Sequence, residues 1–242
     1  MAPDKPGKAQ PKNRADNAMV SPYKPLLLDI SLANQARAGG ATVAGSLYAG
    51  APGQRPTLAR ALGELQLGLH ADLFPSPEQG VSLEELDAIS RFRSSVIDVH
   101  LLSQGSMRHL ETVCNRDVDR ISFPFEGITD PLGIATYIRA AGKSAWLAVA
   151  PATPVTLCSA LLAAVDGVLV MLIPPGSKGS ADISLLRKVH DLVGVGKTVG
   201  VDGGVNVTNV ATILQAGATY LVIGRSLIAS SETKVADSIT LF

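Results

Sequence analysis

Two histidines and two aspartates stand where strand-like segments of the chain end. His70 and Asp72 are two residues apart in the apolar run GLHADLF, so an extended strand would point both side chains to the same face. His100 lies near the end of a second run, SVIDVHLL, and Asp202 ends a third, TVGVD. Two imidazoles and two carboxylates suit a divalent transition metal such as Zn, Mn, Fe or Co.

Each of these residues also has a structural interpretation. A lone strand histidine is more often a hydrogen-bonded core residue than a ligand, and a lone aspartate at a strand end is often a helix N-cap. Burying four such groups together without a partner costs free energy. On the residue pattern alone, a metal site and a purely structural arrangement stay equally open. Asp98 is interpreted as structural, and His109 and His190 as solvated or capping residues of helices.

Glycine-rich segments after three later strand candidates indicate an anion site. Glycine lets the backbone approach a ligand closely, and backbone N–H groups at a helix start point toward an anion. Turns also use glycine, so only the three segments together carry weight, and Lys178 among them has an equal chance of being a solvated loop residue. The residues are Gly176 and Gly179 in the first segment, Gly203 and Gly204 in the second, and Gly224, Arg225 and Ser226 in the third.

These residues are set on an alternation of short apolar runs and helical patterns that begins at residue 25. Such an alternation is typical of a parallel sheet. The predicted strands are 26–30, 68–74, 95–102, 119–125, 144–150, 167–173, 198–202 and 219–223. The predicted helices are 56–66, 82–92, 105–115, 130–141, 154–164, 181–192, 206–216 and 232–239. Asp130 and Thr153 each precede a proline as predicted N-caps, and Gly142 and Gly217 follow predicted helix ends.

The predicted fold class is α/β, a (β/α)8 TIM barrel with a closed parallel eight-stranded sheet. The length of 242 residues fits this fold, in which the carboxyl ends of all strands meet at one mouth and the last two loops often bind phosphate. A doubly wound open sheet uses the same units, but its glycine fingerprint is missing after the first strand.

Two segments interrupt the alternation. Residues 1–24 are rich in Pro, Lys, Asn and Asp and are predicted to be a flexible N-terminal tail, followed by a barrel domain over 25–242. Residues 39–55 contain five glycines and a proline, and we interpret them as a long loop that covers the site.

Charge and apolar patterning narrow the class of partner. Lys+Arg and Asp+Glu both number 21, which gives no general attraction to nucleic acid or to an anionic membrane. No apolar run reaches 18 residues, and the N-terminus lacks the apolar segment of a secretory signal. Cys114 and Cys158 lie in no metal or redox spacing and are interpreted as buried thiols. A cytoplasmic protein is expected.

Several stretches resemble the ribulose-phosphate 3-epimerase family over about residues 25 to 228. They are LHADLF, DVHLL, APATPVTL, VDGVLVM, VDGGVN and QAGATYLVIGRS, in the family's order and spacing. The resemblance implies a (β/α)8 isomerase that acts in carbohydrate metabolism, in the pentose phosphate pathway. It also implies that the protein forms a symmetric homo-oligomer. It implies that a divalent metal ion assists the interconversion of D-ribulose 5-phosphate and D-xylulose 5-phosphate.

The same resemblance assigns roles to individual residues. His70, Asp72, His100 and Asp202 would be the metal ligands, and Asp72 and Asp202 would also be the catalytic acid/base pair. Carried over in the same way, Met171 would line the site. The phosphate would lie on Gly203, Gly204, Gly224 and Ser226, with Gly176 and Gly179 in a flexible loop and Arg225 beside it.

The chain also departs from the family at the lining of this site. The family usually has a serine on its first strand, where Asp29 stands in the first predicted strand. Phe74 replaces a methionine after Asp72, Leu102 a methionine after His100, and Pro124 a common histidine. These changes leave open two alternatives: an epimerase of another ketose phosphate, such as a hexulose 6-phosphate, and a non-catalytic sugar-phosphate-binding barrel.

Overall fold

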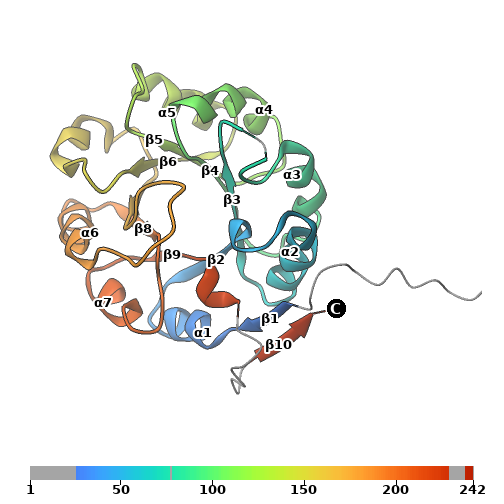
Figure 1. The fold of residues 1–242 in the computed structure, drawn as a ribbon. Coiled ribbons are helices and arrows are strands. Elements are labelled where there is room, and N and C mark those ends of the chain that lie inside the picture. Colours follow the sequence, from blue (N-terminus) through green and yellow to red (C-terminus); the bar gives the residue numbers. More distant parts are fainter. Residues whose placement is uncertain (1–25, 77, 229–237, 242) are drawn as a thin grey trace, which may run out of the picture.

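The computed structural model of the protein describes residues 26–76, 78–228 and 238–241. Eight parallel strands close into a barrel in the order β2-β3-β4-β5-β6-β7-β8-β9. Figure 1 looks down this barrel, and the helices form a ring around it. The predicted (β/α)8 TIM barrel is confirmed.

Seven of the eight predicted strands take part in the barrel. The barrel closes where β2 pairs with β9, with Val43 opposite Leu221. The barrel strands are β2 (Thr42–Ser46), β3 (Gly68–Leu73), β4 (Ile97–Leu101), β5 (Arg120–Pro124), β6 (Ser144–Val149), β7 (Gly167–Met171), β8 (Thr198–Asp202) and β9 (Tyr220–Ile223).

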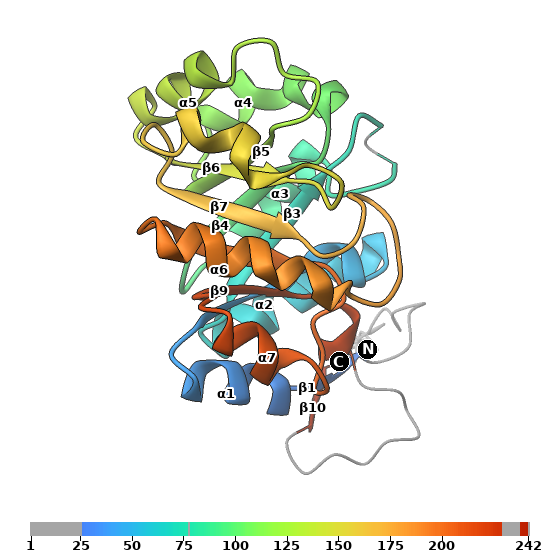
Figure 2. The same cartoon turned by 90° about the vertical axis from the view of Figure 1, so that its left-hand side faces the viewer.

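The first predicted strand lies outside the barrel, so its assignment as the opening barrel strand is wrong. Its observed part, β1 (Leu26–Asp29), pairs antiparallel with β10 (Ser238–Leu241) in a separate two-stranded sheet. Figures 1 and 2 both show this pair beside α1. A short, largely apolar strand of four residues can lie in a peripheral two-stranded sheet as well as in a barrel. Hydrophobic periodicity does not distinguish the two positions.

The first barrel strand is β2, inside the segment 39–55 that we predicted to be a loop. Ala44 and Ser46 face the barrel interior, and Gly45 faces outward against α2. A Cβ at Gly45 would lie 2.6 Å from the Leu62 side chain, so the helix can approach only a glycine here. The sequence pattern does not distinguish a glycine needed for close packing, such as Gly45, from a glycine in a loop, and this is why the segment was wrongly predicted to be a loop. The later part of the segment does line the site, through Tyr48 and Ala49.

The helical predictions are mostly confirmed, with one helix added and three changes of type. The helix α1 was not predicted, residues 155–161 form a 3-10 helix instead of an α-helix, and the helices predicted over 105–115 and 181–192 each begin as a 3-10 segment. The α-helices are α1 (Ser31–Ala38), α2 (Arg55–Glu64), α3 (Leu83–Ser90), α4 (Leu110–Cys114), α5 (Pro131–Ala140), α6 (Leu186–Gly194) and α7 (Val210–Gln215). The 3-10 helices are η1 (Leu47–Ala49), η2 (Pro52–Gln54), η3 (Gln104–His109), η4 (Val155–Leu161), η5 (Ile183–Leu185) and η6 (Arg225–Leu227).

Helix ends follow the predicted residues in three of four cases. The Asp130 side chain accepts a hydrogen bond from the Gly133 backbone N–H at 2.9 Å, which caps α5. Gly142 and Gly217 adopt left-handed φ values of 75° and 97° just beyond α5 and α7. Thr153 is not an N-cap, because its hydroxyl donates instead to the Glu126 carboxylate at 2.5 Å.

Two predictions fall largely outside the described residues. The tail predicted over 1–24 lies there entirely, and so does most of the helix predicted over 232–239, whose last two residues belong to β10. Among the described residues, no helix has both the length and the apolar character needed to cross a membrane.

The barrel interior and the shell around it form two separate cores. In the interior, large aromatic rings pack against glycines, which have no side chain. A Cβ at Gly167 would lie 2.4 Å from the Trp146 ring, and one at Gly200 would lie 2.7 Å from the Tyr220 ring. The larger core lies between the strands and the helices and includes the buried, unbonded Cys114 and Cys158, as predicted. The barrel interior also carries buried polar side chains, among them His70, Asp98 and His100.

Candidate metal centre and anion pocket

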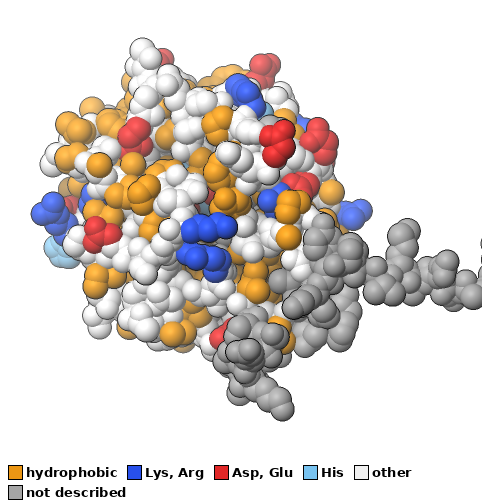
Figure 3. Space-filling view, viewed as in Figure 1, with side chains coloured by type: hydrophobic (Ala, Val, Ile, Leu, Met, Phe, Trp, Pro, Cys, Tyr) orange, Lys and Arg blue, Asp and Glu red, His pale blue; other side chains and the backbone are white. Residues whose placement is uncertain are grey.

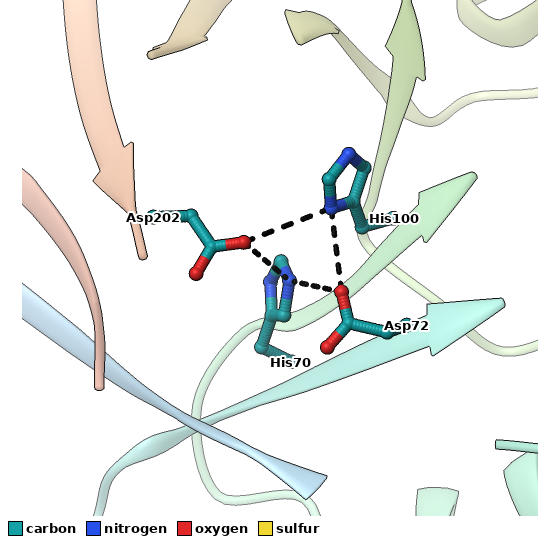
Figure 4. Close-up of side chains that lie close together, drawn as sticks. All are labelled: His70, Asp72, His100 and Asp202. Atoms are coloured by element: carbon teal, nitrogen blue, oxygen red, sulfur yellow. Dashed lines mark hydrogen bonds and ion pairs between the residues drawn. The ribbon is translucent and has the colours of Figure 1, made fainter. Parts of the chain in front are cut away.

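The four residues predicted to bind a metal lie together at the mouth of the barrel. His70, Asp72, His100 and Asp202 each offer one ligand atom, and these atoms lie within 4.8 Å of one another. Figure 4 shows Asp202 and Asp72 pointing toward each other from opposite sides, with the two imidazoles between them. The structure therefore brings together residues from three strands that are up to 132 positions apart in the sequence, from His70 to Asp202.

Each imidazole contacts both carboxylates. His70 Nε2 lies 3.2 Å from Asp72 Oδ1 and 3.8 Å from Asp202 Oδ2. His100 Nδ1 lies 3.3 Å and 3.8 Å from the same two oxygens. The four atoms thus surround one point, as the ligands of a single ion would.

Strand geometry explains this convergence. His70 and Asp72 alternate on β3 and so share its inner face, and the register of β3 with β4 places Asp72 beside His100. Asp202 is the last residue of β8, where Gly203 turns the chain with a φ of 109°. A Cβ at Gly203 would lie 2.6 Å from Ile173, so this turn requires glycine.

Burial and mutual charge set the proton affinities of the cluster. Burial would raise the pKa of Asp72, but the charges of the neighbouring His70 and His100 and the hydrogen bond from His70 outweigh it and lower that pKa. Burial raises the pKa of Asp202 to about 6, and the charge of Asp72 adds to this rise. A cation that binds here has to displace protons from the cluster, so its binding will depend on pH.

The environment of His100 supports the fit of the cluster to a divalent ion. This side chain is buried, and neither of its ring nitrogens has a hydrogen-bond partner among the described residues. A buried polar atom without a partner costs about 1–3 kcal/mol. A cation coordinated by Nδ1 would satisfy one of these atoms, and two imidazoles with two carboxylates suit zinc, manganese, iron or cobalt alike.

Ser46 is a site residue that the sequence analysis missed. Its hydroxyl donates a hydrogen bond of 3.1 Å to Asp72 Oδ2 at the end of β2. Because β2 is the first barrel strand, the serine on that strand is Ser46, and Asp29 does not occupy its position. The Asp29 carboxylate instead accepts hydrogen bonds from the Ser31 N–H and hydroxyl at the start of α1. Only correct strand assignment could have identified Ser46.

A cavity of about 590 Å³ opens above the cluster. Figure 3 shows this face of the molecule, with basic side chains near its centre. Asp72 and Asp202 form part of the cavity wall, whereas His70 and His100 do not line it. The cavity is lined by all the residues predicted to bind substrate or phosphate: Met171, Gly176, Gly179, Gly203, Gly204, Gly224, Arg225 and Ser226.

The loop after β7 lies across one side of this cavity. Arg225 Nη2 donates to the Gly179 carbonyl at 3.1 Å, which joins the loop after β7 to the segment after β9. A Cβ at Gly204 would lie 2.5 Å from the Ala181 backbone nitrogen, so the loop also packs on the turn after β8. Lys178 lines the cavity too, with Nζ 5.9 Å from the centre of the Tyr48 ring.

The residues that depart from the family pattern form an apolar part of the same wall. Phe74 and Leu102 line the cavity, and the Phe74 ring lies 5.1 Å from the Tyr48 ring. Pro124 is buried at the end of β5 and is not among the cavity-lining residues. The changed side chains therefore affect the space beside the ligand cluster and not the cluster itself.

Comparison with known proteins identifies one family. Residues 69–228, about two thirds of the chain, match the model of the "Ribulose-phosphate 3 epimerase family". The matched range begins just before His70 and ends after Ser226, so it contains every ligand and nearly all of the cavity wall.

Curated relatives carry the same description. A ribulose-phosphate 3-epimerase of Mycobacterium leprae is 26% identical over 178 residues, covering 69% of this chain and 80% of that protein. One from Buchnera aphidicola is 31% identical over 154 residues, covering 61% of this chain and 68% of that protein.

Solved structures support the fold. A mutant tryptophan synthase alpha-subunit from Pyrococcus furiosus aligns with a TM-score of 0.60 at 18% identity, covering 78% of this chain and 88% of that chain. At this identity the likeness concerns the barrel and not the chemistry at its mouth.

Proposed function

Because the chain belongs to the ribulose-phosphate 3-epimerase family, we propose that it interconverts D-ribulose 5-phosphate and D-xylulose 5-phosphate with the help of a divalent metal ion. Membership of the family makes it an isomerase, more narrowly an epimerase, with a sugar phosphate as substrate. The observation that carries the proposal is the pair of carboxylates, Asp72 and Asp202, that face each other across the ligand cluster in the cavity wall.

Epimerisation at C3 needs a proton removed from one face of the sugar and returned to the other. Asp72 or Asp202 takes the C3 proton, and the electron pair of the C–H bond moves toward the C2 carbonyl to give an enediolate. The opposite carboxyl group then donates a proton to C3 from the other face. Positioned acid/base groups of this kind contribute about 10²- to 10⁴-fold each.

The enediolate carries negative charge that the site must stabilise. An ion held by His70, Asp72, His100 and Asp202 would supply a Lewis acid worth several kcal/mol to that charge. Ser46 holds the Asp72 carboxylate through its hydroxyl and so fixes the direction from which Asp72 meets the sugar.

The phosphate end is assigned to the glycine-rich side of the cavity. Gly203 and Gly204 turn their backbone with φ values of 109° and 68° beside Gly224, which leaves room for a phosphate against main-chain N–H groups. Arg225 adds a cation at the same rim. This anchoring would set the distance between the phosphate and C3.

Solvent exchange at C3 tests the proposal directly. Incubation with D-ribulose 5-phosphate and added Zn²⁺ or Mn²⁺ in D₂O should incorporate deuterium at C3 and yield D-xylulose 5-phosphate. Asp72→Asn and Asp202→Asn should each lower turnover by about 10²-fold or more, because each removes one proton carrier. Asp119→Asn is the matched control, since its carboxylate accepts the Ile97 N–H at the start of β4, away from the cluster.

Near-normal turnover in either site variant, with the control unchanged, would contradict the two-carboxylate mechanism. The fold of each variant is checked by thermal unfolding.

A second candidate substrate class is favoured by one observation, the apolar wall formed by Tyr48, Phe74 and Leu102. Phe74 and Leu102 in this wall stand where the family has methionines, and the wall borders the cavity that would hold the sugar. A panel of pentulose and hexulose phosphates in the same exchange assay separates the candidates by kcat/KM. If none of the sugar phosphates in the panel incorporates deuterium at C3 and the purified protein binds no metal, the non-catalytic alternative is supported.

A further inference from the structure

Asp98 is a charged residue inside the barrel that the proposed chemistry does not use. It lies on β4 two residues before His100, and its side chain is fully buried. Three side chains from three other strands donate hydrogen bonds to it. They are His70 through Nδ1 at 3.0 Å, Ser122 through its hydroxyl at 3.0 Å, and Tyr220 through its hydroxyl at 2.9 Å.

The contact with His70 decides which nitrogen of that ring faces the cluster. A carboxylate only accepts, so the ring nitrogen bonded to Asp98 carries the hydrogen. That nitrogen is Nδ1. The other nitrogen, Nε2, hydrogen-bonds Asp72 at 3.2 Å and lies 3.8 Å from Asp202, so it is the atom that would exchange its hydrogen for a cation. Asp98 thus selects the tautomer that a metal ligand requires and fixes the plane of the ring.

His100 lacks such a partner. Neither of its ring nitrogens has a hydrogen-bond partner within the described part of the chain, whereas His70 is bonded to Asp98 through Nδ1 and to Asp72 through Nε2. The two imidazoles are therefore not equivalent: one is held by the protein, and the other is oriented by its backbone and packing. A defect at Asp98 should act through His70.

Asp98 is itself held in place from below. The Tyr220 ring packs edge-on against Trp146 at 5.5 Å, and the Arg120 guanidinium carbon lies 4.2 Å from the centre of the Tyr220 ring. Arg120 is also the strand partner of Asp98 across β4 and β5, which places a positive charge beside the buried carboxylate. The aromatic layer inside the barrel thus holds Asp98 in place through Tyr220, and Asp98 in turn orients His70.

We propose that Asp98 is a positioning residue of the metal centre: it holds His70 with Nδ1 protonated and Nε2 directed at the ion. This inference rests on the metal part of the proposed function and is independent of the sugar. It differs from a purely structural role for Asp98, which would leave metal affinity unchanged so long as the barrel folds.

The test measures metal affinity without substrate. Zn²⁺ affinity of the full chain is determined by competition with a chromogenic chelator for the wild type, Asp98→Asn and Asp166→Asn. Asp166 is the matched control, because its carboxylate accepts the Ala145 N–H at the start of β6, remote from the cluster. Loss of an outer carboxylate partner of a metal-bound histidine typically costs about 10- to 100-fold in metal affinity, and we expect a loss of that size for Asp98→Asn only.

A spectroscopic readout separates positioning from general damage. Histidine labelled with ¹⁵N reports which ring nitrogen carries the hydrogen, and the zinc-loaded wild type should show His70 with Nδ1 protonated. Asp98→Asn should shift the His70 signals and leave those of the exposed His190 in place. If Asp98→Asn unfolds, Tyr220→Phe removes one hydrogen bond to Asp98 and should give a smaller loss in the same direction.

The outcomes distinguish the two proposals. Zinc affinity in folded Asp98→Asn within about twofold of the wild type, or unchanged His70 signals, would overturn the positioning role even if the wild type epimerises its substrate. A selective loss of zinc affinity supports the positioning role even if no ketose phosphate is turned over. A wild type that binds no zinc would overturn the inference together with the metal requirement.

Discussion

The ligand cluster and the anion loops occupy the same mouth but are built in different ways. The cluster uses four side chains on strands β3, β4 and β8, and both of its imidazoles are completely buried. The anion side uses glycine backbone on the turns after β7, β8 and β9, where Arg225 and Gly179 are exposed. Strand side chains give fixed directions, whereas turns give close approach.

The comparison teaches where this chain can vary. The four ligands are tied to one another and, through Ser46 and Asp98, to further strands, so a change at one disturbs several contacts. The proposed anion site would use main-chain N–H groups, so we expect its loops to tolerate different side chains so long as the positive φ values of Gly176, Gly203 and Gly204 are kept. If this division is correct, variants of the two regions should fail in different assays.

Loss of a ligand should have the largest effect. We expect Zn²⁺ to raise the melting temperature of the wild type. His100→Ala removes one of four proposed donors, so this rise should be lost and turnover should fall by about 10²-fold or more. Differential scanning fluorimetry with and without Zn²⁺ measures the first effect. His190→Ala changes an exposed histidine and serves as the control. A zinc-dependent rise that survives in His100→Ala would remove this residue from the ligand set.

The pH dependence of stability should come from the cluster. In metal-free protein the pKa of Asp202 is raised to about 6, above the value of about 4 expected in the unfolded chain. The folded state then binds this proton more tightly, so the free energy of unfolding falls as the pH rises from about 4 to about 6. The fall amounts to roughly 1–3 kcal/mol.

Urea unfolding of chelator-treated wild type and Asp202→Asn at pH 4.5 and pH 7 measures this effect. The wild type should lose stability relative to the variant as the pH rises. A difference between the two proteins that is constant with pH would refute the assignment.

A change on the loop side should be smaller and should appear in KM. Gly204 has a φ of 68°, and a Cβ there would lie 2.5 Å from the Ala181 backbone nitrogen, so Gly204→Ala must displace the turn. A left-handed non-glycine residue costs about 1–2 kcal/mol, which corresponds to about tenfold in KM if the strain falls on the phosphate side. Zinc affinity should stay as in the wild type.

Gly196→Ala is the matched control for this variant. It has a similar φ of 78°, but nothing lies within 4 Å of its Cβ position, and it is absent from the cavity wall. It should lose stability without a change in KM. Equal KM effects in both variants would show that strain alone, and not the phosphate side, is responsible.

The sequence by itself determined the fold class and placed the four cluster residues at one mouth, and its resemblance to a known family supplied the roles expected of them. The spacing of His70 and Asp72 predicts a shared strand face, and the strand–helix alternation, with the chain length and no dinucleotide glycine fingerprint, favours a closed barrel whose strand ends converge. Seven strands and all twelve ligand and lining residues named from the sequence lie where those rules put them.

Only the tertiary structure decided which segment opens the barrel. Leu26–Asp29 and Thr42–Ser46 are both short apolar segments, and local pattern favoured the first because glycine interrupts the second. Gly45 is required in the second segment because Leu62 of α2 packs where its Cβ would lie. The local sequence pattern does not reveal this tertiary contact. That error hid Ser46. The contacts of Asp98, which we interpret from the sequence as structural, likewise appear only in the closed barrel, because hydrogen bonds between strands depend on which residues it places together.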